Sequence, residues 1–341
     1  MISKTELNSK YSIALLLSTS KRKSFESLGR ATSLSGDTIA RLLDVNAPTF
    51  HDFLKATIVL FKGKRIYLLL DDTLIDKIYS QHIEGTSDNY VPGDGITKRS
   101  ICSITAMFTD GNIAIPIDHA IWTSKEINPN TYMTKTDIGI QLISKIKEHA
   151  AFDVVIMDGL YATKDMIRWL ISQEIKFEMR YHSNRVIVHK GMKFQIQKCP
   201  LFQLKGRRTE RTIKAYWHEF NLYFTAIKRK NATGRSIITF QVSNYHASAR
   251  KHMKYYGYRW NIEKFFRTGK QYLGLNDCQS RKLERQNGHI FNVFAAYIVA
   301  QFERKKQKCK NVEDAIKSIK FRCLQDPNYA KMRFLQIFFH A

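Results

Sequence analysis

The chain has 341 residues, of which 44% are hydrophobic, and lysine and arginine exceed aspartate and glutamate by 25. This length and composition exclude an intrinsically disordered chain and predict a globular protein with two or three structural units. The charge excess predicts a polyanionic partner, most simply nucleic acid, although an anionic membrane or a generally basic solvated surface also fits it.

The cysteines and the apolar runs indicate the compartment. Five scattered cysteines contain no C-x-x-C pair, which argues against a disulfide framework and a zinc site. No apolar run approaches the length of about 20 residues that a bilayer span requires, and residues 1–6 are too polar for a signal peptide. We therefore expect a soluble, cytoplasmic protein without a membrane partner.

Residues 1–60 predict a helical N-terminal domain. Helical patterns at residues 24–31 and 38–43 flank a polar break, with Ser35 or Asp37 as the N-cap of the second helix. This is the layout of a helix-turn-helix, whose second helix enters a DNA groove. Short helix pairs are also common in folds that never touch DNA.

Residues 61–180 predict the first part of an α/β core. Apolar runs at residues 65–70 and 153–157 are typical of strands buried on both faces, and they are closed by Asp71-Asp72 and by Asp158. A buried carboxylate is costly unless a metal or a cation neutralises it. Other predicted elements are a hairpin of residues 101–108 and 113–117, a helix at 137–149, and a helix at 164–172 capped by Thr163. This order is ribonuclease H-like, although composition alone does not choose it over other α/β folds.

Residues 181–245 predict a basic, β-rich insertion. Between residues 176 and 254 there are 18 lysines or arginines and only three glutamates. Strand-like runs occupy residues 186–189, 212–220, 223–228 and 237–243. We interpret the charge as a DNA-backbone surface, and the alternative is a set of edge strands protected by charge. The candidate phosphate contacts are Lys205, Arg207, Arg208 and Arg211.

A polar stripe follows the insertion. Tyr256, Arg259, Glu263 and Lys270 are spaced +3, +4 and +7, so on one α-helix they fall within roughly 60° of each other. The opposite face of that helix carries apolar and aromatic residues, namely Tyr258, Ile262, Phe265 and Phe266. A carboxylate beside cations and a phenol suits a site that holds a divalent metal and phosphates. The ordinary alternative is a solvated face with an Arg259–Glu263 pair.

The pattern Y-x-x-R-x-x-x-E-x-x-x-x-x-x-K resembles the signature around the catalytic glutamate of a bacterial group, the insertion-sequence family four DDE transposases. The resemblance covers residues 60–300. It implies a ribonuclease H-like mixed sheet flanked by helices, a β-rich insertion before the last catalytic helix, a second core part at residues 246–310 and a C-terminal helical segment at 311–341.

The resemblance also implies the site residues. Asp71, Asp158 and Glu263 are expected to bind two magnesium ions, for which manganese can substitute, while Tyr256, Arg259 and Lys270 bind phosphates near the transposon end. The family pattern of an aspartate two residues before threonine or serine favours Asp71 over Asp72, and only one of these neighbours can face the site from a strand.

The function implied is DNA strand cleavage and strand transfer in cut-and-paste transposition. The expected partners are the inverted-repeat ends of an insertion sequence and target DNA, both double-stranded, bound by a homodimer at the nucleoid. Two alternatives stay open: a catalytically inactive, transposase-derived DNA-binding protein, and a ribonuclease H-like nuclease without strand transfer.

Overall fold

The computed structural model describes residues 4–44, 47–91, 93–127, 129–204, 209–231 and 233–338. The chain is mixed α/β and divides into two compact units. Unit 1 is drawn from residues 1–64, 72–134 and 261–341, and unit 2 from residues 65–71 and 135–260. The boundary therefore crosses strand β1 (Tyr67–Asp76) after Asp71, and helix α8 (Trp260–Tyr272) after its first residue.

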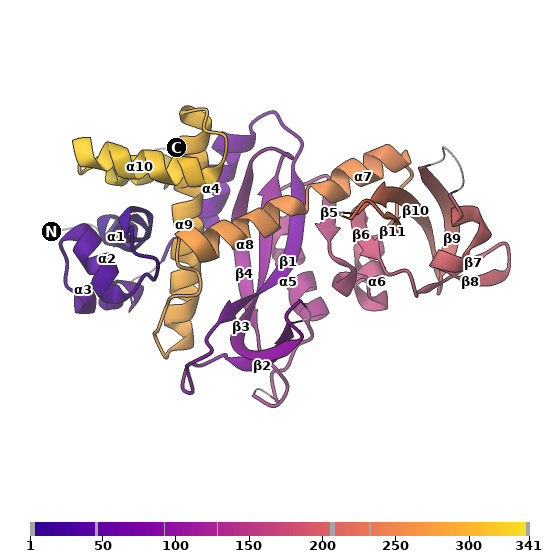
Figure 1. Ribbon diagram of the computed structural model, residues 1–341, viewed down its shortest axis with the longest axis horizontal. Helices are drawn as coiled ribbons and strands as arrows, with labels where there is room; N and C mark the ends of the chain where they lie inside the picture. The colour runs from indigo at the N-terminus through magenta and orange to yellow at the C-terminus, as the bar shows by residue number, and fades with distance from the viewer. Residues whose placement is uncertain are drawn as a thin grey trace. The chain divides into compact units, whose positions relative to one another are not determined.

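Unit 1 combines helices with three antiparallel strands, in which β3 pairs with β2 on one side and with β4 on the other. Figure 1 labels these elements apart from α11. Besides most of α8 and a 3-10 turn at Leu42–Asp44, they are α1 (Lys4–Leu17), α2 (Phe25–Thr32), α3 (Gly36–Arg41), α4 (Phe50–Phe61), β2 (Ser87–Val91), β3 (Ile96–Thr109), β4 (Ala114–Trp122), α9 (Leu283–Lys306), α10 (Val312–Gln325) and α11 (Tyr329–Phe338).

Helix α9 is the centre of the core of unit 1. It contacts α1, α10 and β4, and residues along its whole middle are buried. The Tyr11 hydroxyl on α1 bonds His289 Nδ1 on α9 at 3.0 Å, and Phe53 on α4 contacts Phe294 with ring centroids 6.0 Å apart. No helix in the described ranges is both long enough and apolar enough to cross a membrane.

Unit 2 is a mixed sheet with strand order β1-β5-β6-β11-β10-β9-β7-β8. The pairs β1–β5 and β5–β6 are parallel, and the remaining neighbours are antiparallel. Its elements are α5 (Lys135–His149), β5 (Val154–Met157), α6 (Lys164–Ser172), β6 (Phe177–Tyr181), β7 (Val186–His189), β8 (Met192–Gln195), β9 (Glu210–Trp217), β10 (Phe220–Lys230), β11 (Ser236–Ser243) and α7 (Ala249–Gly257), with 3-10 turns at Gly159–Tyr161, Ile196–Lys198 and Pro200–Phe202.

Helices cover both faces of the parallel strands of unit 2. On one face Leu70 of β1 lies against α5, where a Cβ added to Gly139 would come within 3.0 Å of Leu70 Cδ2. On the other face Tyr67 of β1 packs against Tyr255 of α7, with ring centroids 4.8 Å apart. Because side chains alternate along a strand, Asp71 points to the same face as Tyr67, the face that α7 covers.

Several predicted elements are confirmed. Helix α6 occupies residues 164–172, and the Thr163 side chain caps it by accepting from the Met166 N–H. The β3–β4 hairpin and the helix at Lys135–His149 are present, and so are the four runs of the insertion, which contains the unpredicted strand β8 as well. Helices α2 and α3 flank the polar break, and Ser35 caps α3. The division of the sequence at residues 60, 180, 245 and 310 stays a prediction.

Two expectations were wrong. The first strand does not end at Leu70: β1 continues to Asp76, so Asp71 and Asp72 lie inside it, and its buried positions alternate from Asp71 onward. The polar stripe does not lie on one helix. Helix α7 ends at Gly257, and the N–H groups of Tyr258 and Arg259 bond three residues back rather than four. Glycine is a poor helix former, which favours a tightened turn at this point.

Candidate active site

The parallel strands of unit 2 bring two of the predicted carboxylates level. The last paired residues on β1, β5 and β6 are Leu70, Met157 and Met179. The next residue on each strand is Asp71, Asp158 or Arg180, so the same register places these three residues side by side in one row. The row continues into β11, because Arg180 pairs with Gln241. Two acidic side chains and one basic side chain therefore share the face that α7 covers.

The segment at the end of α7 contacts both carboxylates. The Tyr256 hydroxyl donates to Asp158 Oδ1 at 3.3 Å. Arg259 Nη1 donates to Asp71 Oδ2 at 2.6 Å, and the Arg259 guanidinium also lies 5.8 Å from the centre of the Tyr256 ring. One polar cluster within unit 2 thus brings together β1, the residue directly after β5, the last turn of α7 and the turn that follows it, although the bonded residues are 98 and 188 positions apart in the sequence.

Burial makes this cluster electrostatically demanding. The Arg259 and Asp71 side chains are only 17% and 12% exposed. Removing two charges from water costs several kcal/mol per ion, and the short contact between them offsets part of this cost. Burial also raises the pKa of the Tyr256 hydroxyl, and the carboxylate of Asp158 adds to that rise, so the phenol stays a hydrogen-bond donor at neutral pH.

Gly159 directly follows Asp158, and it has a steric reason to be glycine. A Cβ at this position would lie 2.7 Å from His182 Nε2 and 3.1 Å from the Arg180 carbonyl oxygen. A larger residue would therefore require the His182 ring to move and the backbone at Arg180 to shift slightly beside the carboxylate.

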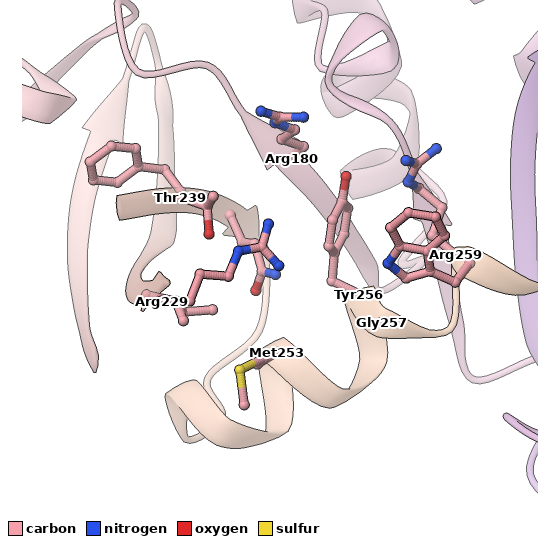
Figure 2. Close-up of a pocket in the computed structure, with 11 residues that line it drawn as sticks. Arg180, Arg229, Thr239, Met253, Tyr256, Gly257 and Arg259 are labelled. Atoms are coloured by element: carbon pink, nitrogen blue, oxygen red, sulfur yellow. The ribbon is translucent and has the colours of Figure 1, made fainter. Parts of the chain in front are cut away.

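A cavity of about 210 Å³ opens beside this cluster, within unit 2. Figure 2 shows Arg180, Arg229 and Arg259 around the Tyr256 ring, and no acidic residue belongs to the described lining. Three guanidinium groups without a carboxylate in the wall favour an anion such as a phosphate. We call this cavity the arginine pocket; its lining is Arg180, Ile227, Arg229, Thr239, Phe240, Gln241, Met253, Tyr256, Gly257, Arg259 and Trp260.

Helix α7 is itself held by a buried polar cluster that the sequence did not reveal. Glu178 on β6 accepts hydrogen bonds from His252 Nδ1 at 2.7 Å and from the Tyr245 hydroxyl at 3.0 Å. Both Glu178 and His252 are fully buried. Burial raises the pKa of Glu178, although the two hydrogen bonds oppose the rise. This cluster fixes α7 to β6 one turn before Tyr256.

Glu263 and Lys270 lie on α8, in the part of that helix that belongs to unit 1. Glu263 is half-buried in the first turn, and Lys270 is half-buried in the last. Burial lowers the pKa of Lys270, and Lys98 lowers it further, whereas Asp76 acts in the opposite direction.

The predicted cations of the insertion are only partly described. Arg211 lies on β9, half-buried, and its Nη1 donates to the Leu201 carbonyl oxygen at 3.2 Å. Lys205, Arg207 and Arg208 lie outside the described residues. Sequence reasoning missed Arg180 and Arg229, which line the arginine pocket. The only available signal was the polar alternation along β6, with Glu178 and Arg180 on one face.

The donor set of the polar row fits a hard divalent cation. Asp71 and Asp158 offer carboxylate oxygens, the ligands that such ions prefer. Within the described part of the chain, no three histidine, cysteine, aspartate or glutamate side chains form a ready-made metal cluster. The fit therefore rests on the chemistry of the two aspartates that the register brings together.

Comparison with known families gives the identity of the chain. Residues 108–299 match the transposase DDE domain, and this match covers more than half of the chain. The chain belongs to the transposase DDE domain family. The matched residues include Asp158 and Glu263, whereas Asp71 precedes them. No curated protein matches the chain significantly. Family membership implies a transposase, with polynucleotidyl transfer as its general chemistry and divalent metals as its general cofactors.

Proposed function

We propose that this chain is a cut-and-paste DNA transposase of the insertion-sequence family four type, with a ribonuclease H-like core. The observation that carries the proposal is the row of Asp71 and Asp158 on neighbouring parallel strands, with Tyr256 and Arg259 bonded to them. Carboxylates that can bind a metal, together with groups that can bind phosphate, suit this reaction. They meet within unit 2 although the chain separates them widely.

Glu263 is proposed as the third carboxylate, and the covalent chain supports it. Arg259 is bonded to Asp71, and Glu263 follows Arg259 by four residues, of which Trp260 to Glu263 are helical. Four residues of chain span at most about 14 Å, and less in a helix. The chain therefore separates Glu263 by only one helical turn from the arginine that pairs with Asp71.

Strand alternation supports Asp71 over Asp72 as the first ligand. Asp71 shares the face of Tyr67, and Arg259 reaches it there. Asp72 points to the other face of β1, where the Cys102 thiol donates to its Oδ2 at 3.6 Å.

Magnesium bound by the three carboxylates would activate the attacking water or 3′-hydroxyl and stabilise the leaving oxygen. The residues of the chain do the rest. Arg259 keeps Asp71 paired until substrate arrives, and it then exchanges this carboxylate for a DNA phosphate. Tyr256 holds Asp158 in place and offers its hydroxyl to the same backbone, while Lys270 and the arginine pocket bind further phosphates.

The proposed partners are the inverted-repeat ends of an insertion sequence and target DNA, bound by a homodimer. The insertion, with Lys205, Arg207, Arg208 and Arg211, is proposed to follow the DNA backbone. Its large charge excess supports this role.

Incubation of the purified protein with magnesium and DNA that carries the flanking repeats tests the proposal. Excision together with joining to a target plasmid would support it. Nicking without joining would indicate a nuclease, and binding without cleavage would indicate a catalytically silent DNA-binding protein.

A further inference from the structure

A second basic cavity, of about 230 Å³, lies within unit 1. It is formed where the start of α10 meets the end of α9, the middle of α8 and the β3–β4 turn. We call it the α10 cleft. Its lining is Gly111, Asn112, Asn261, Lys264, Arg267, Thr268, Tyr297, Gln301, Arg304, Lys310, Asn311, Val312 and Glu313.

Hydrogen bonds between these elements fix the walls of the cleft. Thr268 Oγ1 on α8 donates to Glu313 Oε1 on α10 at 2.6 Å. Arg304 on α9 donates through Nη1 to the Asn112 carbonyl oxygen and through Nη2 to Asn112 Oδ1, both at 3.1 Å. Asn261 Nδ2 reaches the β3–β4 turn as well, at 3.3 Å from Thr109 Oγ1. Hydrogen bonds between separate elements thus define the shape of the cleft and give it a polar floor.

The rim of the cleft carries cations that the fold does not use. Lys264, Arg267 and Lys310 are exposed, and within the described ranges none of them forms an ion pair or a hydrogen bond. The single acid in the lining, Glu313, already accepts from Thr268. These cations increase the attraction of the cleft for an anion and do not stabilise the fold through a carboxylate.

Charged groups gather around the floor of the cleft. Burial raises the pKa of the Tyr297 hydroxyl there and Glu313 adds to the rise, while a Gln301 hydrogen bond, Arg304 and Arg267 oppose it. The 14-residue helix α10 also begins here, with Asn311 as its N-cap, and the positive end of its dipole adds to the potential.

The basic surface extends beyond the cleft. A neighbouring cavity shares Asn112 and Arg304 with it and is also lined by Lys305 and Lys308. Cations spread over two adjoining openings suit a chain of phosphates better than a single small anion. A polyphosphate backbone with one charge per about 1.7 Å of duplex axis matches such a surface.

We propose that the α10 cleft binds backbone phosphates of duplex DNA without reading sequence. This inference rests on the proposed function, because it assigns a second contact surface for the same class of substrate. It is carried by unit 1 alone and does not depend on the arginine pocket.

The test is the salt dependence of binding to a random-sequence duplex without an inverted repeat. The triple variant Lys264→Gln, Arg267→Gln, Lys310→Gln should reduce the slope of log K against log salt by about 2 to 3, at about 0.9 per phosphate contact. The matched control Lys55→Gln, Lys62→Gln, Lys282→Gln removes the same charge from exposed positions of unit 1 outside the cleft. It should keep the wild-type slope.

The inference is overturned if the cleft variant keeps the wild-type slope, or if the control loses as much as the cleft variant. A cleft-specific loss in a protein that never cuts DNA would support the inference while the catalytic proposal fails. Cleavage of end-containing DNA together with an unchanged slope would support the catalytic proposal and overturn this inference. If the wild-type protein binds no duplex at all, both proposals fail.

Discussion

The arginine pocket of unit 2 and the α10 cleft of unit 1 are both basic, but they hold their cations in different ways. In unit 2, Arg259 is mostly buried and bonded to Asp71 beside a second carboxylate, so a hydrogen bond and the surrounding side chains hold its position. In unit 1, Lys264, Arg267 and Lys310 are exposed side chains at the rim of a polar cleft. Buried, paired groups suit a reaction that requires a defined geometry, whereas exposed charges suit attachment along a DNA backbone.

The largest effect should come from the carboxylates of the reaction. Asp71→Asn, Asp158→Asn and Glu263→Gln each remove a negative charge at nearly constant shape, so metal-dependent cleavage should fall below detection while DNA binding persists. Gel assays of strand cleavage and of binding measure the two separately. Asp72→Asn is the neighbouring control and should retain cleavage. An inactive Asp72 variant with an active Asp71 variant would reverse the assignment of the first ligand.

Variants of Arg259 and Lys270 compare a cation that pairs with a buried carboxylate with one for which the described residues show no ion pair. Replacing either with glutamine should reduce cleavage by about tenfold or more, since a charge-assisted bond contributes roughly 1.5 to 3 kcal/mol. Only Arg259→Gln removes a mostly buried ion-pair contact to Asp71, so it should also lower the free energy of unfolding by about 2 to 4 kcal/mol.

Denaturation curves beside the cleavage assay separate these two effects. Arg259→Lys should recover part of the stability and little of the activity, because lysine keeps the charge but loses the planar fork. Wild-type cleavage in both glutamine variants would remove the main functional support for the transposase proposal.

The insertion should behave like the α10 cleft rather than like the arginine pocket. Neutralising Lys205, Arg207, Arg208 and Arg211 together should reduce the salt slope of binding by about 0.9 for each lost phosphate contact. The melting temperature of the variant serves as a control for loss of stability, because the Arg211 guanidinium also donates to the Leu201 carbonyl oxygen. An unchanged slope would mean that the DNA binds elsewhere and that the cations of this segment form an ordinary solvated surface.

Local signals in the sequence predicted the parts of the site that short segments determine. The apolar run before Asp158 and the Thr163 cap are both readable within a few residues, and each lies where we expected. Strand β1 was harder, because beyond Leu70 it alternates buried and half-buried positions and no longer shows an apolar run.

What the sequence could not predict depends on pairing over long distances. The level row of Asp71, Asp158 and Arg180 follows from the register of three parallel strands, and no single segment encodes that register. The same holds for Arg229, which a distant strand brings to the arginine pocket. The tight turn at Tyr258 is local, but the spacing of polar residues on both sides fits an unbroken helix equally well.

The smallest effect concerns the cluster that fixes α7. The raised pKa of Glu178 means that its protonation stabilises the folded state below its ordinary pKa of about 4.5, and that this contribution is lost as the pH rises through the folded value. Relative to Glu178→Gln, the wild-type protein should therefore lose stability as the pH rises from about 4.5, by at most about 1.4 kcal/mol per pH unit between the two pKa values.

Glu219→Gln is the matched control, because its backbone and the Arg168 side chain lower the pKa of this exposed glutamate, so its contribution should change in the opposite direction. Chemical denaturation between pH 4 and pH 8 measures both differences. If the stability of the wild-type protein relative to Glu178→Gln rose with pH instead, the buried glutamate would act as a charged, stabilising partner of His252, and the prediction would be wrong.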